Sequence, residues 1–169
     1  MNKHKLAISA FVAITLITTA CKKNDLKHQP ANQKTTETAA TSQWKSVSTW
    51  SNSKQDEFTV FSGKIEDNNI TSEVVSKGLV LVYKSNGANV LTLPGEDKNA
   101  NNYWYYQVSK GSVIITSDVY GAAAEFDQSS TFQYFILTKE KVAELEAQGY
   151  SKAKLMSLSH ADASQLLAK

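Results

Sequence analysis

Short apolar runs, separated by glycine and asparagine, are the main pattern of this chain after residue 44. The pattern is clearest in residues 78–120, where two pairs of β-branched and aromatic runs are each joined by a turn sequence. Asn86-Gly87 joins the first pair and Lys110-Gly111 joins the second. A glycine turn between two such runs is the strongest short-range signal of a β-hairpin. The stretch therefore predicts two successive hairpins, the first with a two-residue type I′ turn at Asn86-Gly87.

Seven segments have the length and composition of β-strands: 44–50, 57–65, 79–83, 90–93, 103–108, 113–119 and 131–137. Many short strands with glycine or asparagine turns favour a mainly β fold, an antiparallel β-sandwich of about seven strands. The run 79–83 is apolar at every position, which predicts a central strand that is covered on both faces. Gly63 is expected to mark a bulge or the end of a strand.

Two helices are predicted from their capping residues. Thr71 is expected to cap a single helical turn that Gly78 ends in the left-handed conformation. Thr138 is expected to begin a longer helix with an apolar strip, which ends at Gly149.

A last short helix is expected over residues 161–167, with Ser159 or His160 as its cap. The segments 95–101 and 121–130 are expected to be loops. Short C-terminal helices of this kind pack on an end or a face of a sandwich. An α+β domain with a single sheet and a layer of helices is the alternative fold.

The first 20 residues have the organisation of a signal peptide. A short basic start precedes the apolar run 6–17, which is too short to cross a hydrocarbon core, since a spanning helix needs about 20 residues. Small residues then lead to Cys21, the only cysteine. This arrangement resembles a bacterial lipoprotein signal, although such signals usually have Leu where this chain has Thr18. The resemblance implies cleavage before Cys21, acylation of Cys21, and an anchor in the outer membrane that faces the periplasm or the cell surface.

Residues 21–43 are polar, with one Leu, one Pro and no Phe, Trp or Tyr. Such a segment buries too little apolar surface to offset the entropy lost on ordering, which predicts a flexible tether between lipid and domain. Residues 44–169 are then predicted to form a single mainly β domain. A chain of 169 residues is long enough for one such domain with a substantial core.

The charge of the mature chain argues against nucleic-acid binding. The full chain has 18 lysines, no arginine and 16 acidic residues. Lys3 and Lys5 precede the predicted cleavage site, which leaves 16 basic against 16 acidic residues. Proteins that read nucleic acids normally use arginine for bidentate contacts with bases and phosphates.

Motifs for catalysis or for metal binding are not found in the sequence. His160 is the only histidine after the tether, and no nucleophile-elbow pattern surrounds a serine. The chain has no cysteine and histidine spacing for zinc and no glycine-rich phosphate loop. Asp118, Glu125 and Asp127 border one loop, but they lack the order of an EF-hand. The sequence therefore predicts no cofactor, no metal and no identifiable catalytic residue.

Four successive aromatic residues, Tyr103 to Tyr106, are the most distinctive group in the chain. Side chains alternate along a strand, so two faces are predicted. One face holds Trp104, Tyr106 and Val108, and the other holds Tyr103, Tyr105 and Gln107. The Trp104 face is expected to fill the core, as aromatic strand residues usually do. Tyr103 and Tyr105 are the candidate ligand-facing aromatics, for a glycan or a protein ligand, because amphipathic rings suit half-wet interfaces.

A further resemblance follows from the order of motifs along residues 44–167. The motifs are Trp, then Ile70-Thr71, Gly78, Leu81-Val82-Tyr83, Leu93-Pro94, and Phe132-Gln133-Tyr134 before a closing helix. This order is similar to that of small secreted lipoproteins of Bacteroidetes-type bacteria, a group of uncharacterised function. The resemblance implies a fold and an envelope location, and it implies no catalytic residue.

Two functions remain open at this point. The favoured hypothesis is a lipid-anchored, non-enzymatic binding or structural module of the cell envelope. The alternative is a small envelope hydrolase or inhibitor-like domain that acts on peptide or glycan. A concave pocket with converging acids would favour the enzyme, whereas a flat patch rich in aromatic residues would favour binding.

Overall fold

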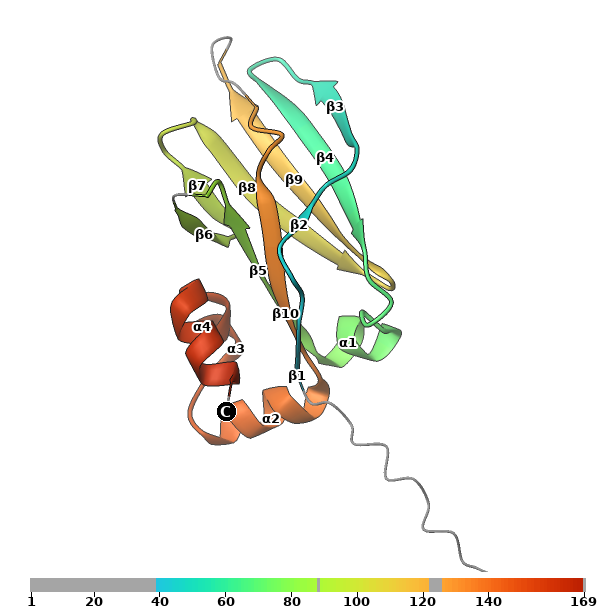
Figure 1. The fold of residues 1–169 in the computed structure, drawn as a ribbon, viewed down its shortest axis with the longest axis vertical. Coiled ribbons are helices and arrows are strands. Elements are labelled where there is room, and N and C mark those ends of the chain that lie inside the picture. Colours follow the sequence, from blue (N-terminus) through green and yellow to red (C-terminus); the bar gives the residue numbers. More distant parts are fainter. Residues whose placement is uncertain (1–38, 88, 122–125, 169) are drawn as a thin grey trace, which may run out of the picture. The chain divides into compact units, whose positions relative to one another are not determined.

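Ten strands build two antiparallel sheets in the computed structural model, which describes residues 39–87, 89–121 and 126–168 (Figure 1). Sheet A has the order β1 (Ala39–Thr41), β10 (Thr131–Leu137), β5 (Leu79–Ser85) and β6 (Val90–Leu93), with β2 (Lys45–Ser46) also paired to β10. Sheet B has the order β3 (Trp50–Lys54), β4 (Phe58–Glu66), β9 (Ser112–Tyr120), β8 (Asn102–Ser109) and β7 (Gly95–Asp97). The predicted antiparallel sandwich is confirmed, and the single-sheet alternative is wrong. The predicted signal peptide, Cys21 and the tether up to residue 38 lie outside the described residues.

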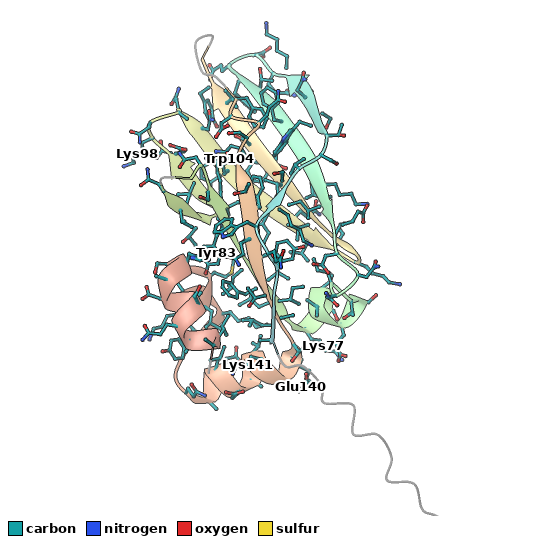
Figure 2. The ribbon with its side chains drawn as sticks, viewed as in Figure 1. Lys77, Tyr83, Lys98, Trp104, Glu140 and Lys141 are labelled. Carbon is teal, nitrogen blue, oxygen red and sulfur yellow. The ribbon has the colours of Figure 1, made fainter. Side chains whose placement is uncertain are left out.

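The inner faces of the two sheets enclose one buried core. Its largest members are Trp104 from sheet B and Phe132 and Tyr134 from sheet A, and none of the three is exposed to solvent. Trp104 lies among the strands of the sandwich, whereas Tyr83 lies beside the C-terminal helices (Figure 2). The difference follows from alternation along β5, which sends Val82 into the sandwich and Tyr83 to the opposite face.

A second core lies between sheet A and the C-terminal helices α2 (Lys139–Ala147), α3 (Lys152–Met156) and α4 (His160–Leu167). It contains Leu81, Tyr83, Phe135 and Leu137 from the sheet and Val142, Leu145, Leu155 and Ala163 from the helices. Strands β5 and β10 are therefore buried on both faces, as the continuous apolar run 79–83 predicted. The described domain has three layers, in the order sheet B, sheet A and helices.

The predicted strand 44–50 is wrong as a single element. Residues 45–46 pair with β10 in sheet A, whereas Trp50 begins β3 in sheet B, so the chain crosses from one sheet to the other. Val47 is buried at this crossing. A Cβ atom at Gly63 of β4 would overlap the Cγ1 atom of Val47. Gly63 thus permits the close approach of two chain segments, and the ladder through it is continuous, so the expected bulge or strand end is also wrong.

A second crossing between sheets occurs at Pro94. Strand β6 ends at Leu93 in sheet A, and β7 begins at Gly95 in sheet B. Proline cannot donate to a ladder, so it suits the point where the chain leaves one sheet. The prediction of a loop over residues 95–101 is wrong for its first three residues, because Glu96 pairs with Tyr103 of β8.

The two predicted hairpins are present, with one difference in turn length. Lys110 and Gly111 form a two-residue turn between β8 and β9, since Ser109 pairs with Ser112. Ser85 pairs with Val90, so four residues, 86–89, connect β5 and β6. The two-residue type I′ turn at Asn86-Gly87 is therefore wrong.

The predicted helix caps are largely confirmed. The Thr71 hydroxyl oxygen accepts a hydrogen bond from the backbone N–H of Val74, 3.2 Å away, and caps α1 (Ser72–Lys77). Thr138 caps α2 in the same way, and Ser159 caps α4. The left-handed stop at Gly78 is wrong, because its φ is −85°. Helix α3, whose N-cap is Ser151, was not predicted from the sequence.

The end of α2 has the backbone hydrogen bonds of a Schellman motif. The N–H of Tyr150 donates to the carbonyl oxygen of Leu145, and the N–H of Gly149 donates to that of Glu146, each at 3.0 Å. Gly149 has a φ of +90°, which the motif requires at this position. The prediction that the helix ends at Gly149 is confirmed.

The described part of the domain begins earlier than expected. Strand β1 lies within residues 21–43, the predicted tether, and its Ala40 pairs with Ile136 of β10. In the described ranges, no helix is long and apolar enough to cross a membrane.

Candidate functional site

The outer face of sheet B is the candidate binding surface. Helices α2, α3 and α4 pack on sheet A, on the far side of the sandwich, so they leave this face uncovered. Strand register then decides which side chains share it, because residues paired across neighbouring strands point to the same side. We call this surface the tyrosine face, after Tyr103, Tyr105 and Tyr120.

Strand β8 has the alternation that the sequence predicts. Trp104 has no exposed surface, whereas 41% of Tyr103 is exposed. The Tyr106 hydroxyl donates a hydrogen bond to the Val80 carbonyl oxygen of sheet A, 2.7 Å away, so this side chain crosses the interior. Tyr105 is half-buried on the outer side. The predicted division of β8 into a core face and an outward face is confirmed.

One row of the tyrosine face runs across three strands. Glu96 of β7 pairs with Tyr103 of β8, and Tyr103 pairs with Asp118 of β9. The Tyr105 hydroxyl donates to Oδ1 of Asp118 at 3.2 Å, and the ring centroids of Tyr103 and Tyr105 are 6.1 Å apart. Two carboxylates thus lie on either side of an exposed ring.

A second aromatic pair lies beside this row. Tyr120, 38% exposed, pairs in register with Phe58 of β4, and their ring centroids are 5.3 Å apart. The amide nitrogen Nδ2 of Asn101 donates to the Tyr120 carbonyl oxygen at 3.0 Å, and the Tyr120 N–H donates to the Asn101 carbonyl oxygen at 3.2 Å. These bonds fix the loop before β8 against the end of β9.

The exposed rings border a groove of about 270 Å³. Its walls are Glu96, Asn101, Asn102, Tyr103 and Tyr120. A second groove of about 350 Å³ lies on the other side of β7 and also includes Glu96. Its lining contains Lys84, Asn86, Asn89, Leu91, Asp97, Lys98 and Asn99, among others. Small-molecule sites typically have volumes of about 300–1,000 Å³, so the volume of each groove alone is near the lower limit of this range.

The Tyr105 hydroxyl is a hydrogen-bond donor on the tyrosine face. Burial raises the pKa of the Tyr105 hydroxyl, and the nearby Asp118 carboxylate raises it further. This hydroxyl therefore stays protonated at neutral pH and acts as a donor. The ammonium group of Lys84, in contrast, is buried beneath β7 and paired with Asp97.

Sequence reasoning found Tyr103 and Tyr105 but missed Tyr120, Phe58, Glu96 and Asn101. Tyr120 could have been found by extending the alternation of residues 113–119 by one residue. The others could not, because the polar pattern of residues 95–101 predicts a loop and because strand register joins positions far apart in the chain.

His160 has the surroundings of a packing residue. Its Nε2 atom is hydrogen-bonded to Oε1 of Gln133, and its ring contacts Trp44, Tyr83 and Phe135. Burial lowers its pKa. The neighbouring Ser159 hydroxyl contacts the Asp162 carboxylate, at 2.6 Å, and caps α4 instead of contacting the imidazole.

A partly buried triangle of polar groups, formed by Lys45, Asp67 and Tyr134, also has a structural explanation. Nζ of Lys45 lies 2.8 Å from the Tyr134 hydroxyl and 3.1 Å from Oδ2 of Asp67, and the Tyr134 hydroxyl donates to Asp67 at 2.7 Å. Burial raises the pKa of Tyr134 to about 12, which argues against a phenolate nucleophile. The triangle joins β2, β10 and the segment after β4.

Asp118 and Asp127, two of the acidic residues that border the loop after β9, have separate hydrogen-bond partners. Asp118 belongs to the tyrosine face, and Asp127 accepts hydrogen bonds from the Ser129 and Ser130 hydroxyls. Glu125 lies outside the described residues. Within those residues, no group of three or more His, Cys, Asp or Glu side chains could hold a metal ion.

Comparison of the chain with protein-family models, with curated proteins and with solved structures finds no match. The resemblance to small secreted lipoproteins therefore stays a prediction.

Proposed function

We propose that this chain is a lipid-anchored, non-enzymatic binding module of the bacterial cell envelope, and that it captures its ligand on the tyrosine face. The N-terminal sequence supports the anchor, through Cys21 and the residues before it. Cys21 and residues 22–38 precede the described residues, so the anchor and the binding function are tested separately.

One observation carries the binding half. Tyr103 and Tyr120 are large aromatic side chains that remain about two-fifths exposed on a sheet face which no described helix covers. Both border the same groove. An aromatic residue with a polar tip is well suited to a contact that is apolar at the ring and wet at its edge. Burial of these rings would favour association, which is the reason that exposed aromatic residues mark interaction sites.

The arrangement of acids supports binding over hydrolysis. Glu96 and Asp118 lie on β7 and β9, with Tyr103 of β8 between them. Neighbouring strands are about 4.8 Å apart, so the backbones of the two acids are separated by about 10 Å. Asp118 also accepts the hydrogen bond from Tyr105. Of these two acids only Glu96 lines the groove, so the groove wall does not contain a pair of carboxylates.

The binding half is tested with the acylated full-length product held by its own lipid in a supported bilayer. A water-soluble extract of the envelope of the producing bacterium is passed over it, and mass uptake is recorded. We expect the double variant Tyr103→Ala/Tyr120→Ala to reduce uptake at least tenfold. Gln107→Ala is the matched control, because Gln107 is an exposed residue of β8 on the same face but away from the groove.

Two results would contradict the binding half. Equal uptake by the double variant and by the control would place the ligand elsewhere. Release of reducing ends or of peptides from the extract by the wild-type protein would favour the hydrolase.

The anchor is tested by Cys21→Ser. We expect the substituted protein to leave the membrane fraction and to lose retention on the bilayer, because the thiol that carries the lipid is absent. Membrane retention equal to that of the wild type would show that another feature attaches the protein.

A further inference from the structure

We infer that the ligand of the tyrosine face is a neutral oligosaccharide that runs across β7, from the groove beside Tyr120 to the groove beside Asn89. This inference rests on the proposed binding function and specifies its ligand. It follows from three properties of the two grooves: their rings, their hydrogen-bonding groups and their charge.

The exposed rings offer flat apolar surfaces on which sugar rings can pack. The Tyr103 and Tyr105 centroids are 6.1 Å apart, and the Phe58 and Tyr120 centroids are 5.3 Å apart. The interplanar angles of 32° and 40° turn the two rings of each pair to different directions. Sugar rings have one face of C–H groups, which packs on such aromatic faces, and an edge of hydroxyl groups that remains for hydrogen bonds.

Hydrogen-bonding groups surround the rings. The Glu96 carboxylate and the Asn101 side chain line the groove, and the Asp118 carboxylate lies next to Tyr103 in register. Carboxylate oxygens accept from hydroxyl groups, and amides both donate and accept. A purely apolar partner, such as a lipid chain, would leave these groups without water or partners, at a cost in free energy.

The charges of the grooves favour a neutral ligand. The second groove contains two cationic side chains, Lys84 and Lys98, and two anionic ones, Glu96 and Asp97. The ammonium group of Lys84 lies 3.2 Å from the Asp97 carboxylate, so it is already neutralised. Lys98 lies at the edge of the domain beside β7 (Figure 2). A phosphate-rich polymer would meet the Glu96 carboxylate in the first groove, where no lysine lines the wall, and the Asp118 carboxylate beside Tyr103 would repel it further.

The position of β7 joins the grooves into one path. Glu96 lines both, and β7 has only three residues, Gly95–Asp97. The second groove adds the asparagines of two loops, Asn89 from the β5–β6 connection and Asn99 from the β7–β8 connection. Because each groove is small alone, a chain of sugars that contacts both is favoured over a single sugar.

The ligand class is tested on the bilayer with the same envelope extract after three treatments. Sodium periodate cleaves the vicinal diols of sugars, proteinase K digests proteins, and organic extraction removes lipids. We expect periodate to reduce uptake at least tenfold, and the other two treatments to leave it within twofold. If uptake is lost after proteinase K or after organic extraction but is unchanged after periodate, the ligand is a protein or a lipid. This result would overturn the inference of an oligosaccharide, while the proposed binding function would remain. Uptake that does not depend on Tyr103 and Tyr120 in the untreated extract would overturn the binding function itself.

The mode of contact is tested by substitution and by salt. We expect Tyr103→Phe to retain binding within threefold, because the ring face remains, whereas Tyr103→Ala weakens it at least tenfold. Binding of a neutral sugar should change less than twofold when sodium chloride is raised to 0.5 M, since salt screens contacts between charges. A basic peptide held by Glu96 and Asp118 would instead bind more weakly in salt, and this result would overturn the inference.

The path across β7 is tested with Asn89→Ala. We expect a threefold or larger loss of uptake, because Asn89 lines only the second groove. Asn52→Ala is the control, as Asn52 is an exposed asparagine of the edge strand β3. Wild-type uptake by Asn89→Ala would confine the ligand to the first groove and would overturn the crossing.

Discussion

Lys84 and Asp97 form an ion pair between the two sheets, with Nζ of the lysine 3.2 Å from Oδ2 of the aspartate. Lys84 belongs to β5 in sheet A, and Asp97 belongs to β7 in sheet B. Only 4% of the Lys84 side chain is exposed, and its ammonium group lies 4.8 Å from the centroid of a Trp104 ring. The pair therefore holds β7, the strand of Glu96, against the rest of the sandwich.

We expect Lys84→Met to lower the free energy of unfolding by about 2–4 kcal/mol. Methionine keeps most of the apolar stem but leaves the Asp97 carboxylate without its cation, and the loss of one partner of a buried pair costs about 3–5 kcal/mol. We expect a somewhat smaller loss of stability here, because 18% of the Asp97 side chain is exposed and water can solvate its carboxylate. Urea denaturation measures the change, and Lys98→Met, at an exposed neighbour, should alter stability by less than about 0.5 kcal/mol. Equal stability of the two variants would show that the pair contributes little.

Trp104 and Tyr103 are adjacent in sequence, yet we expect very different costs when each becomes alanine. Trp104→Ala should lower the free energy of unfolding by about 3–5 kcal/mol, because it empties a fully buried site. Tyr103→Ala should cost less than about 1 kcal/mol, because its ring is partly exposed. Chemical denaturation of both variants makes the comparison. Similar costs would show that the outward side of β8 is covered in solution.

The sequence predicted the faces of β8 because alternation is a local property. Each residue of a strand points opposite to its neighbour, so Tyr103 and Tyr105 could be assigned to one side without knowledge of any other strand. The same reasoning identified β5 as a strand with two covered faces, since a layer on only one side would leave Leu81 or Val82 exposed.

Features that depend on partners distant in sequence were missed. The segment of β3, Trp50 to Lys54, is polar apart from its first residue, and only its pairing with β4 makes it a strand. The local sequence around Val47 does not predict that the chain passes from sheet A to sheet B at this residue. Glu96 entered the candidate site only through its pairing with Tyr103, because register, and not local composition, brings these two side chains together.

Gly63 is required for close packing, whereas Gly87 is required for a positive φ. We therefore expect alanine at the two positions to lower the free energy of unfolding by different amounts. At Gly63 a Cβ atom would overlap Val47, while at Gly87 it would meet no atom within 4 Å. Gly87 has a φ of +89°, at which alanine costs about 1–2 kcal/mol. Gly63→Ala should cost at least about 2 kcal/mol, because the crowded Val47 side chain has to move in a packed core. The difference in urea midpoint between the variants measures this, and a larger loss for Gly87→Ala would show that the crossing near Val47 is loosely packed.

His160 should make the domain less stable as the pH falls below neutrality. Burial lowers the pKa of its imidazole below the ordinary value of about 6.5, so the unfolded chain takes up a proton at a higher pH than the folded one. The stability that the neutral His160 imidazole contributes is fully present above the pKa of the unfolded state. It decreases as the pH falls from about 7 through 6.5, and it is lost entirely once the pH is below the folded pKa.

The measurement compares the wild type with His160→Phe by urea denaturation at several pH values from 8 to 5. Phenylalanine keeps a ring against Trp44, Tyr83 and Phe135 but cannot be protonated. Other titrating groups, including the nearby Asp162, are common to both proteins, so the difference between the two curves isolates His160. We expect the wild type to lose stability relative to the variant as the pH falls. A difference that is constant from pH 8 to pH 5 would show that the imidazole is as readily protonated in the folded domain as in the unfolded chain.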